Sequence, residues 1–251
     1  MGFLDGKVAL VTGAGQGVGQ GIAYALSAEG AVLAVSGRTL SKVETTAAEI
    51  RRRGGTAHPF LCDVNDKAAL DRLVEQVVGQ CGGIQILVNN AQEVPLGTLL
   101  QVTDEAFMAG IHSGPLASLR LMRACYPHLK GDGVIINLGT AASLRQDMSG
   151  YGAYAAVKEA TRSLTRAAAC EWGTEGIRVN CIVPLAMSKG MEGWIAARPE
   201  EAAAFLATIP MRHAGDCETE IGRAVAQICG PAFGFVTGQT IPVDGGQAFL
   251  R

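Results

Sequence analysis

The chain has 251 residues, a formal net charge of −2 and 18% charged residues. That balance supplies no long-range field to gather nucleic-acid phosphates, and no apolar run approaches the roughly 20 residues needed to span a bilayer. With 48% hydrophobic residues and no linker-like shift in composition, residues 1–251 are expected to form one domain.

The seven cysteines are odd in number and scattered, and none belongs to a Cys-x-x-Cys pair. This usage is typical of reduced thiols rather than of disulfides or a zinc site. The N-terminus lacks the basic and then apolar segments of an export signal. We therefore expect a cytoplasmic protein with no metal, nucleic-acid or membrane partner.

Short β-branched runs alternate with longer segments of helical period along the whole chain. The expected strands are Val8–Val11, Val32–Val35, Ala57–Leu61, Ile84–Val88, Val134–Leu138, Val179–Val183 and Thr240–Val243. The expected helices lie near residues 17–29, 40–53, 66–80, 103–130, 151–175, 190–207 and 217–229. This alternation predicts an α/β fold, a Rossmann-type doubly wound parallel sheet of about seven strands with helices on both faces. Ligands of such sheets bind at the carboxyl ends of the strands.

Two sequence features concern the ends and the interior of the helices. Asp66 and Thr103 are suited to cap the helices that follow them. Gly114-Pro115 falls inside the 103–130 helix, where proline lacks a backbone donor and clashes with the preceding turn. We expect a kink or a break there.

A glycine-rich segment, Thr12–Gly19, follows the first expected strand and opens the first helix. Glycines in this setting let a pyrophosphate approach backbone N–H groups. The spacing is TGxxxGxG rather than GxGxxG, because Val18 takes the place of the third glycine. The segment alone is also compatible with a purely structural turn.

Polar residues follow the next three strands as well. The second ends in Ser36-Gly37-Arg38, which offers no carboxylate to a ribose 2′-hydroxyl but an arginine to a 2′-phosphate. The third is followed by Asp63-Val64 and the fourth by Asn90-Ala91. The pattern favours NADP(H) over NAD(H).

Tyr154 and Lys158 stand one helical turn apart in the segment Tyr154-Ala155-Ala156-Val157-Lys158. A nearby cation stabilises phenolate and lowers the pKa of tyrosine toward a value useful for proton transfer. The pair is therefore a candidate acid–base centre.

Taken in this order, the motifs resemble those of the short-chain dehydrogenase/reductase family, from about Lys7 to Gly246. They are TGxxxGxG at Thr12–Gly19, Asp63-Val64, Asn89-Asn90-Ala91, YxxxK at Tyr154–Lys158, Arg178-Val179-Asn180 before Pro184, and Thr237-Gly238-Gln239 leading to Asp244-Gly245-Gly246. The resemblance implies hydride transfer between a nicotinamide cofactor and a substrate carbon.

The resemblance also assigns roles to individual residues. Tyr154 would act as general acid in reduction, Lys158 would hold the nicotinamide ribose, and a hydroxyl would orient the substrate oxygen. Cofactor contacts would come from Gly13, Gln16, Gly17, Val18, Gly19, Arg38, Asp63, Val64, Asn90, Ala91, Tyr154, Lys158 and Pro184.

Several positions depart from the family pattern. Thr140 takes the place of the usual serine if the loop before Tyr154 is one residue longer, with Ser143 as the fallback. Gln92 stands where a glycine is usual. Ile111 stands where the family has a relay asparagine, beside His112, which either relays protons or lies on the helix surface.

Residues 185–211 are expected to form a substrate lid. Its apolar residues recur at roughly helical intervals, and Met187 or Trp194 either packs the lid or touches the substrate together with Ser143 and Gln92. By resemblance, the 103–130 and 151–175 helices would pair in a homo-oligomer, most simply a tetramer.

The sequence therefore predicts an oxidoreductase that transfers hydride between NADP(H) and an uncharged carbonyl or secondary alcohol. Two alternatives stay open. One is a cofactor-binding regulator of the same fold with weak or no turnover, and the other is a redox epimerase or a dehalogenase-type variant.

Overall fold

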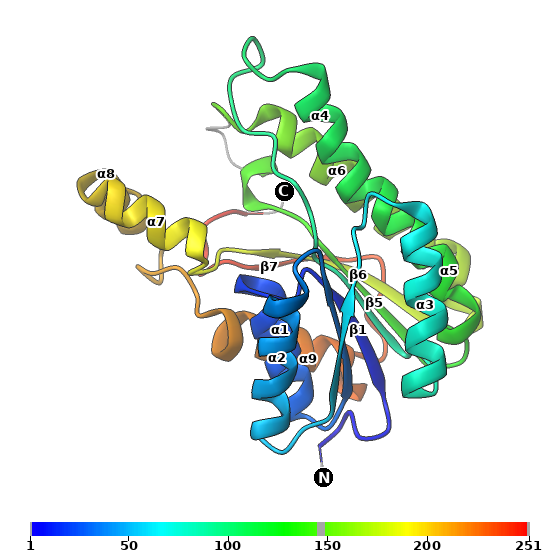
Figure 1. Ribbon diagram of the computed structural model, residues 1–251. Coiled ribbons are helices and arrows are strands. Elements are labelled where there is room, and N and C mark those ends of the chain that lie inside the picture. Colours follow the sequence, from blue (N-terminus) through cyan, green and yellow to red (C-terminus); the bar gives the residue numbers. More distant parts are fainter. Residues whose placement is uncertain (1, 145–148, 250–251) are drawn as a thin grey trace.

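The computed structural model describes residues 2–144 and 149–249. Within these residues, seven parallel strands form one sheet in the order β3-β2-β1-β4-β5-β6-β7 (Figure 1). The strands are β1 (Val8–Thr12), β2 (Val32–Gly37), β3 (Ala57–Leu61), β4 (Ile86–Asn89), β5 (Gly133–Leu138), β6 (Ile177–Pro184) and β7 (Thr240–Val243). The predicted doubly wound parallel sheet is confirmed, although β4 begins two residues later than expected.

Helices cover both faces of the sheet. They are α1 (Gly17–Ala28), α2 (Leu40–Arg52), α3 (Lys67–Cys81), α4 (Asp104–Ile111), α5 (Ala117–Leu129), α6 (Gly152–Trp172), α7 (Lys189–Ala197), α8 (Pro199–Thr208) and α9 (Arg223–Cys229). Alternate residues of β1 enter different cores: Ala9 and Val11 pack with α1, α2 and α9, whereas Val8 and Leu10 pack with α3, α5 and α6. Each face of the sheet thus has its own apolar core.

The helix expected at 103–130 is continuous but irregular. Between α4 and α5, the segment His112–Leu116 is π-helical and contains Pro115. A π turn changes the hydrogen-bond spacing, so the missing N–H of proline does not end the helix. The expected caps are present, because Asp66 accepts from Ala68 N and Thr103 accepts from Ala106 N.

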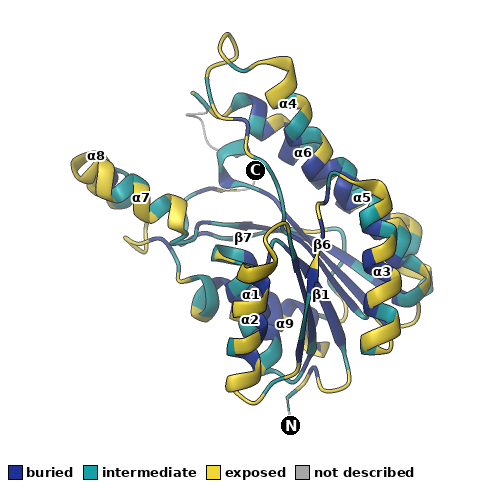
Figure 2. Ribbon diagram, in the orientation of Figure 1, coloured by how far each residue is buried: buried dark blue, intermediate teal, exposed yellow. Residues whose placement is uncertain are grey.

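The expected helix at 190–207 is two helices, α7 and α8. They meet at Arg198, whose φ of −141° and ψ of 66° are not helical. Arg198 precedes Pro199, and a residue before proline is disfavoured in the helical region. Figure 2 shows that both helices project from the body of the protein and are largely exposed.

No helix in the part of the chain that the structure describes is long and apolar enough to cross a membrane.

Candidate active site

The glycine loop between β1 and α1 forms one wall of a cleft at the carboxyl ends of the strands. Gly13 and Gly17 adopt φ values of +66° and +57°, which side chains rarely tolerate. The loop leads into the N-terminus of α1, where Gln16 makes no capping side-chain bond to the helix. We call this space the glycine-loop cleft; residues lining it include Gly13, Gly15, Gln16, Gly17, Val18, Arg38, Lys42, Val64, Asn90, Ala91, Gln92, Glu93, Ser113 and Lys189.

Of the residues expected to contact a cofactor, Gly19 and Asp63 line neither this cleft nor the cavity that adjoins it. A Cβ built on Gly19 would lie 2.4 Å from Asn90 Nδ2, so this glycine lets α1 approach the loop after β4. Asp63 Oδ1 accepts hydrogen bonds from the backbone and side-chain nitrogens of Asn65, at 3.0 and 3.1 Å. Their visible role is to shape the loops.

The loop after β4 is fixed to the glycine loop by hydrogen bonds. Thr12 Oγ1 accepts from the backbone nitrogens of Asn90 and Ala91, at 3.0 and 3.1 Å. Asn90 Nδ2 donates to the carbonyl oxygens of Thr12 and Gly13. Asn90 therefore links the glycine loop to the loop after β4, which are two walls of the cleft.

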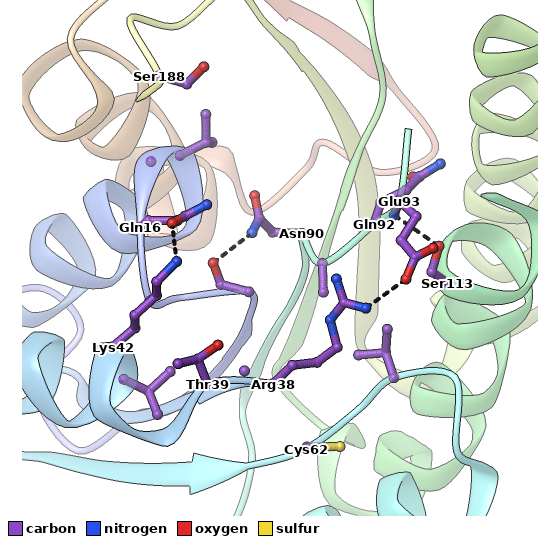
Figure 3. A pocket seen from close by; sticks show the side chains of 18 of the residues that line it. Gln16, Arg38, Thr39, Lys42, Cys62, Asn90, Gln92, Glu93, Ser113 and Ser188 are labelled. Carbon is purple, nitrogen blue, oxygen red and sulfur yellow. Dashed lines mark hydrogen bonds and ion pairs between the residues drawn. The ribbon is translucent and has the colours of Figure 1, made fainter. Parts of the chain in front are cut away.

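Charged side chains of the cleft include two that sequence reasoning missed, Lys42 and Glu93. Lys42 Nζ donates to Gln16 Oε1 at 2.8 Å, which brings a cation from α2 to the glycine loop. Glu93 Oε1 accepts from Arg38 Nη1 at 2.7 Å (Figure 3). The sequence could have indicated Lys42 as a cleft residue, because it lies in the first turn of the helix that follows β2.

A second space, which we call the tyrosine cavity, adjoins the cleft and shares Val18, Asn90, Gln92 and Ser188 with it. The residues lining it are Val18, Asn90, Gln92, Val94, Leu138, Gly139, Thr140, Ala141, Ala142, Tyr151, Tyr154, Lys158, Pro184, Leu185, Ala186, Ser188, Met191, Phe205 and Gln247. It brings together the tyrosine, the lysine and the threonine hydroxyl selected from the sequence.

Lys158 is a buried, positively charged residue on α6. Its side chain donates from Nζ to the carbonyl oxygen of Leu138 at 2.7 Å, and its Nζ lies 5.7 Å from the ring centre of Tyr154. The residue is only 4% exposed, and this burial lowers its pKa to about 8. Its proton is therefore held less tightly than that of a surface lysine.

Tyr154 does not have the lowered pKa expected from the sequence. Burial raises the pKa of its phenol, and a hydrogen bond with the Thr140 side chain opposes that rise. Thr140 Oγ1 also accepts from Ala142 N at 3.3 Å, so its hydrogen is available to the phenol oxygen. At neutral pH the phenol is thus a protonated donor in contact with a second hydroxyl.

Ser143 and His112 lie outside this constellation. Ser143 Oγ donates to the carbonyl oxygen of Thr140 at 3.0 Å, and Ser143 does not line the tyrosine cavity. The His112 residue is exposed and lines neither space. The position of His112 is that of a helix-surface histidine.

Gln92 lies where the two spaces meet. Its Nε2 is buried without a hydrogen-bond partner. The same amide lies against Gly114 of the π-helical segment, because a Cβ built there would be 2.9 Å from Gln92 Nε2. A buried donor without a partner is energetically costly.

The lid residues named from the sequence pack the lid. Trp194 on α7 contacts Phe205 on α8 edge to face, with ring centres 5.6 Å apart. Met187 packs against a small cluster that contains Leu185 and Ile209. The residues of the 185–211 segment that line the tyrosine cavity are Leu185, Ala186, Ser188, Met191 and Phe205.

Comparison with known proteins agrees with this arrangement. Residues 13–248 match the family described as enoyl-(acyl carrier protein) reductase. A 12alpha-hydroxysteroid dehydrogenase of Clostridium sp. is 39% identical over 255 residues, which cover 98% of each chain. The chain belongs to the short-chain dehydrogenase/reductase family.

Solved structures support the assignment of this short-chain dehydrogenase/reductase. A 7 alpha-hydroxysteroid dehydrogenase complexed with NADH and 7-oxo glycochenodeoxycholic acid has a TM-score of 0.91 at 30% identity, covering 97% of this chain and 94% of that one. A short chain dehydrogenase of Burkholderia cenocepacia in complex with NADP has a TM-score of 0.90 at 29% identity, covering 97% and 98%. The protein is an NAD(P)-dependent oxidoreductase of alcohol and carbonyl substrates.

The glycine-loop cleft fits such a dinucleotide. Gly17 carries no side chain, and a Cβ there would approach no atom closer than 3.8 Å. The space beside the α1 N-terminus is therefore available to a phosphate. Arg38 and Lys42 add positive charge along the same lining.

Proposed function

We propose that this short-chain dehydrogenase/reductase interconverts an uncharged ketone and its secondary alcohol, with NADP(H) preferred to NAD(H). The preference is supported by two cations in the glycine-loop cleft, Arg38 after β2 and Lys42 on α2. No carboxylate stands at the end of β2, where an acidic residue would receive the ribose 2′-hydroxyl of NAD.

The observation that carries the catalytic proposal is that Thr140, Tyr154 and the buried Lys158 line the same cavity. A bound nicotinamide cofactor supplies hydride transfer. Tyr154 gives its proton to the carbonyl oxygen during reduction, and Thr140 orients that oxygen with its hydroxyl. Lys158 stabilises the phenolate that forms and offers donors to ribose hydroxyls.

The substrate class follows from the lining of the tyrosine cavity. Among the described residues that line it, Lys158 is the only charged one, and most others are apolar. A cationic substrate would lose its hydration there without an opposite charge, and the one cation, Lys158, already donates to the Leu138 carbonyl oxygen and is assigned to Tyr154 and the cofactor ribose. We therefore propose uncharged secondary alcohols with an apolar skeleton as the first substrates to test.

Cofactor binding tests the first part of this proposal. NADPH and NADH are titrated by calorimetry against the wild-type protein and against the variants Arg38→Ala and Lys42→Ala. Loss of either cation is expected to weaken NADPH binding about tenfold, with little effect on NADH. Lys67→Ala, an exposed lysine on α3 outside the cleft, is the matched control. Equal affinities of the wild-type protein for both cofactors would overturn the preference.

Turnover tests the second part. A panel of ketones is screened with NADPH, and the corresponding alcohols with NADP+, by nicotinamide absorbance. Tyr154→Phe is expected to abolish turnover while NADPH binding stays within about twofold, because only the proton donor is lost. Undiminished turnover of Tyr154→Phe would refute the catalytic assignment.

A further inference from the structure

The glycine-loop cleft contains an acidic residue that the dinucleotide motifs do not account for. Glu93 follows β4, and among the described residues lining the cleft it is the only acidic one. Its Oε1 lies 2.7 Å from Arg38 Nη1, on the segment that follows β2. Figure 3 shows the two side chains extending toward each other from these separate segments.

The backbone of Glu93 is hydrogen-bonded to the π-helical segment between α4 and α5. Its N–H donates to Ser113 Oγ at 2.9 Å, and Ser113 Oγ in turn donates to the carbonyl oxygen of Ala109 at 2.6 Å. Ser113 is 2% exposed, so this anchor is part of the helix interior. Together with the Asn90 hydrogen bonds, the anchor fixes the backbone from which the Glu93 carboxylate reaches Arg38.

The side chains of the pair are accessible to a ligand. The Arg38 side chain is 59% exposed and that of Glu93 is 37% exposed. An ion pair this exposed is weak, because water and salt screen it. A bound phosphate can therefore compete for the guanidinium, whose planar fork suits a phosphate as well as a carboxylate.

We propose that Glu93 is a specificity-determining residue that limits the preference for NADP(H). Its carboxylate competes with the 2′-phosphate for Arg38 and places a like charge beside that phosphate. The same carboxylate is an acceptor for a ribose 2′-hydroxyl, a role that acidic residues at the end of the second strand fill in NAD-binding folds. The inference rests on the proposed use of Arg38 by the cofactor.

Removal of this charge should therefore separate the two cofactors. In Glu93→Gln, NADPH is expected to bind roughly fivefold more tightly, the scale of an exposed ion pair, while NADH binds equally or more weakly. The amide keeps the size of the side chain, so the loop has no reason to move. Competition for Arg38 also requires that the gain shrink when the arginine is absent.

The experiment measures the affinities of NADPH and NADH by calorimetry for four proteins: wild type, Glu93→Gln, Arg38→Met and the double variant. Glu175→Gln is the matched control, since Glu175 pairs with Lys130 outside the cleft and its loss changes the net charge equally. The expected result is a higher NADPH-to-NADH preference in Glu93→Gln only. At least half of the gain should disappear in the Arg38→Met background.

Three results would overturn the inference: an unchanged preference in Glu93→Gln, weaker NADPH binding in that variant, or a full gain without Arg38. Weaker binding would mean that Glu93 positions Arg38 for the phosphate instead of competing with it. If wild-type protein binds neither cofactor, or binds NADPH no more tightly than Arg38→Met does, the proposed cofactor function itself fails. The two failures are thus distinguishable.

Discussion

The side-chain amide of Gln92 packs against the backbone of Gly114, leaving no room for a Cβ. A Cβ at Gly114 would lie 2.9 Å from both Cδ and Nε2 of Gln92. Gln92 replaces a glycine of the family pattern, and Gly114 belongs to the π-helical segment that follows α4. The larger residue on the loop is therefore matched by the smallest one on the helix.

Gly114→Ala is expected to displace Gln92 rather than to unfold the helix. The clashing atoms are the end of a flexible side chain, which can move at low cost, but the cleft and the tyrosine cavity are where it would move. We expect NADPH binding to weaken about three- to tenfold, equivalent to roughly 1 kcal/mol. In a Gln92→Gly background the same substitution should be neutral for binding. It should then stabilise the protein by about 0.5–1 kcal/mol, as Ala for Gly does in helices. Equal effects in both backgrounds, by calorimetry and thermal unfolding, would contradict the pairing.

The two candidate hydroxyls give opposite expectations. Thr140→Ala removes the hydroxyl that contacts Tyr154 and should reduce kcat/KM on the order of 10²-fold, the scale for a well-placed polar group. Ser143→Ala removes a donor to a backbone carbonyl outside the tyrosine cavity and should stay within about threefold. Thr140→Ser should restore most activity. Steady-state kinetics decides between them, and a crippled Ser143→Ala beside an active Thr140→Ala would reverse the assignment.

The pH dependence of turnover follows from the opposite pKa shifts of Lys158 and Tyr154. Reduction needs a protonated Tyr154 and a cationic Lys158. Because the Tyr154 pKa is raised and that of Lys158 is lowered to about 8, Lys158 loses its charge first as the pH increases. We expect the reduction rate to fall with rising pH through a midpoint near pH 8, as Lys158 loses its proton. Lys158→Arg keeps its charge throughout, so any activity that it retains should lack this decline. A wild-type profile that stays flat to pH 9.5 would refute the prediction.

The parallel sheet could be predicted because each apolar run in the sequence is followed directly by polar residues. Runs such as Val32–Val35 and Val134–Leu138 are apolar enough to be strands buried on both faces of a sheet. Parallel topology brings the carboxyl ends of such strands to one edge. This logic places Thr140 at the ligand edge, whereas Tyr154 and Lys158 on α6 were selected from their one-turn spacing and from the family resemblance. It could not foresee the raised pKa of Tyr154, because burial depends on packing across the whole cavity.

Other parts of the site depend on contacts between distant elements. The approach of Lys42 to Gln16, and of Glu93 to Arg38, requires side-chain directions that periodicity does not give. The division of the lid into α7 and α8 does have a signal in the sequence, because Pro199 predicts that a helix ends at Arg198. The regular spacing of apolar residues across 190–207 instead favours a single helix.

Met191 and Met187 offer a matched test of the lid. Both are partly buried lid methionines that pack against the cluster of Leu185 and Ile209, but only Met191 also lines the tyrosine cavity. Met191→Ala removes apolar surface from the substrate side and should raise KM about five- to tenfold with kcat nearly unchanged. Met187→Ala leaves a gap in the lid base and should instead lower Tm by about 2–4 °C, the shift for a loss of about 1 kcal/mol in a chain of this size.

The two readouts separate contact with substrate from support of the lid. Kinetics with one apolar ketone and thermal unfolding are measured on the same preparations of both variants. If Met187→Ala raises KM as much as Met191→Ala does, the lid acts as one unit, and lining the cavity confers no special role. If Met191→Ala lowers Tm without changing KM, the substrate does not reach α7. The predicted pattern requires KM to respond only at the residue that faces the cavity.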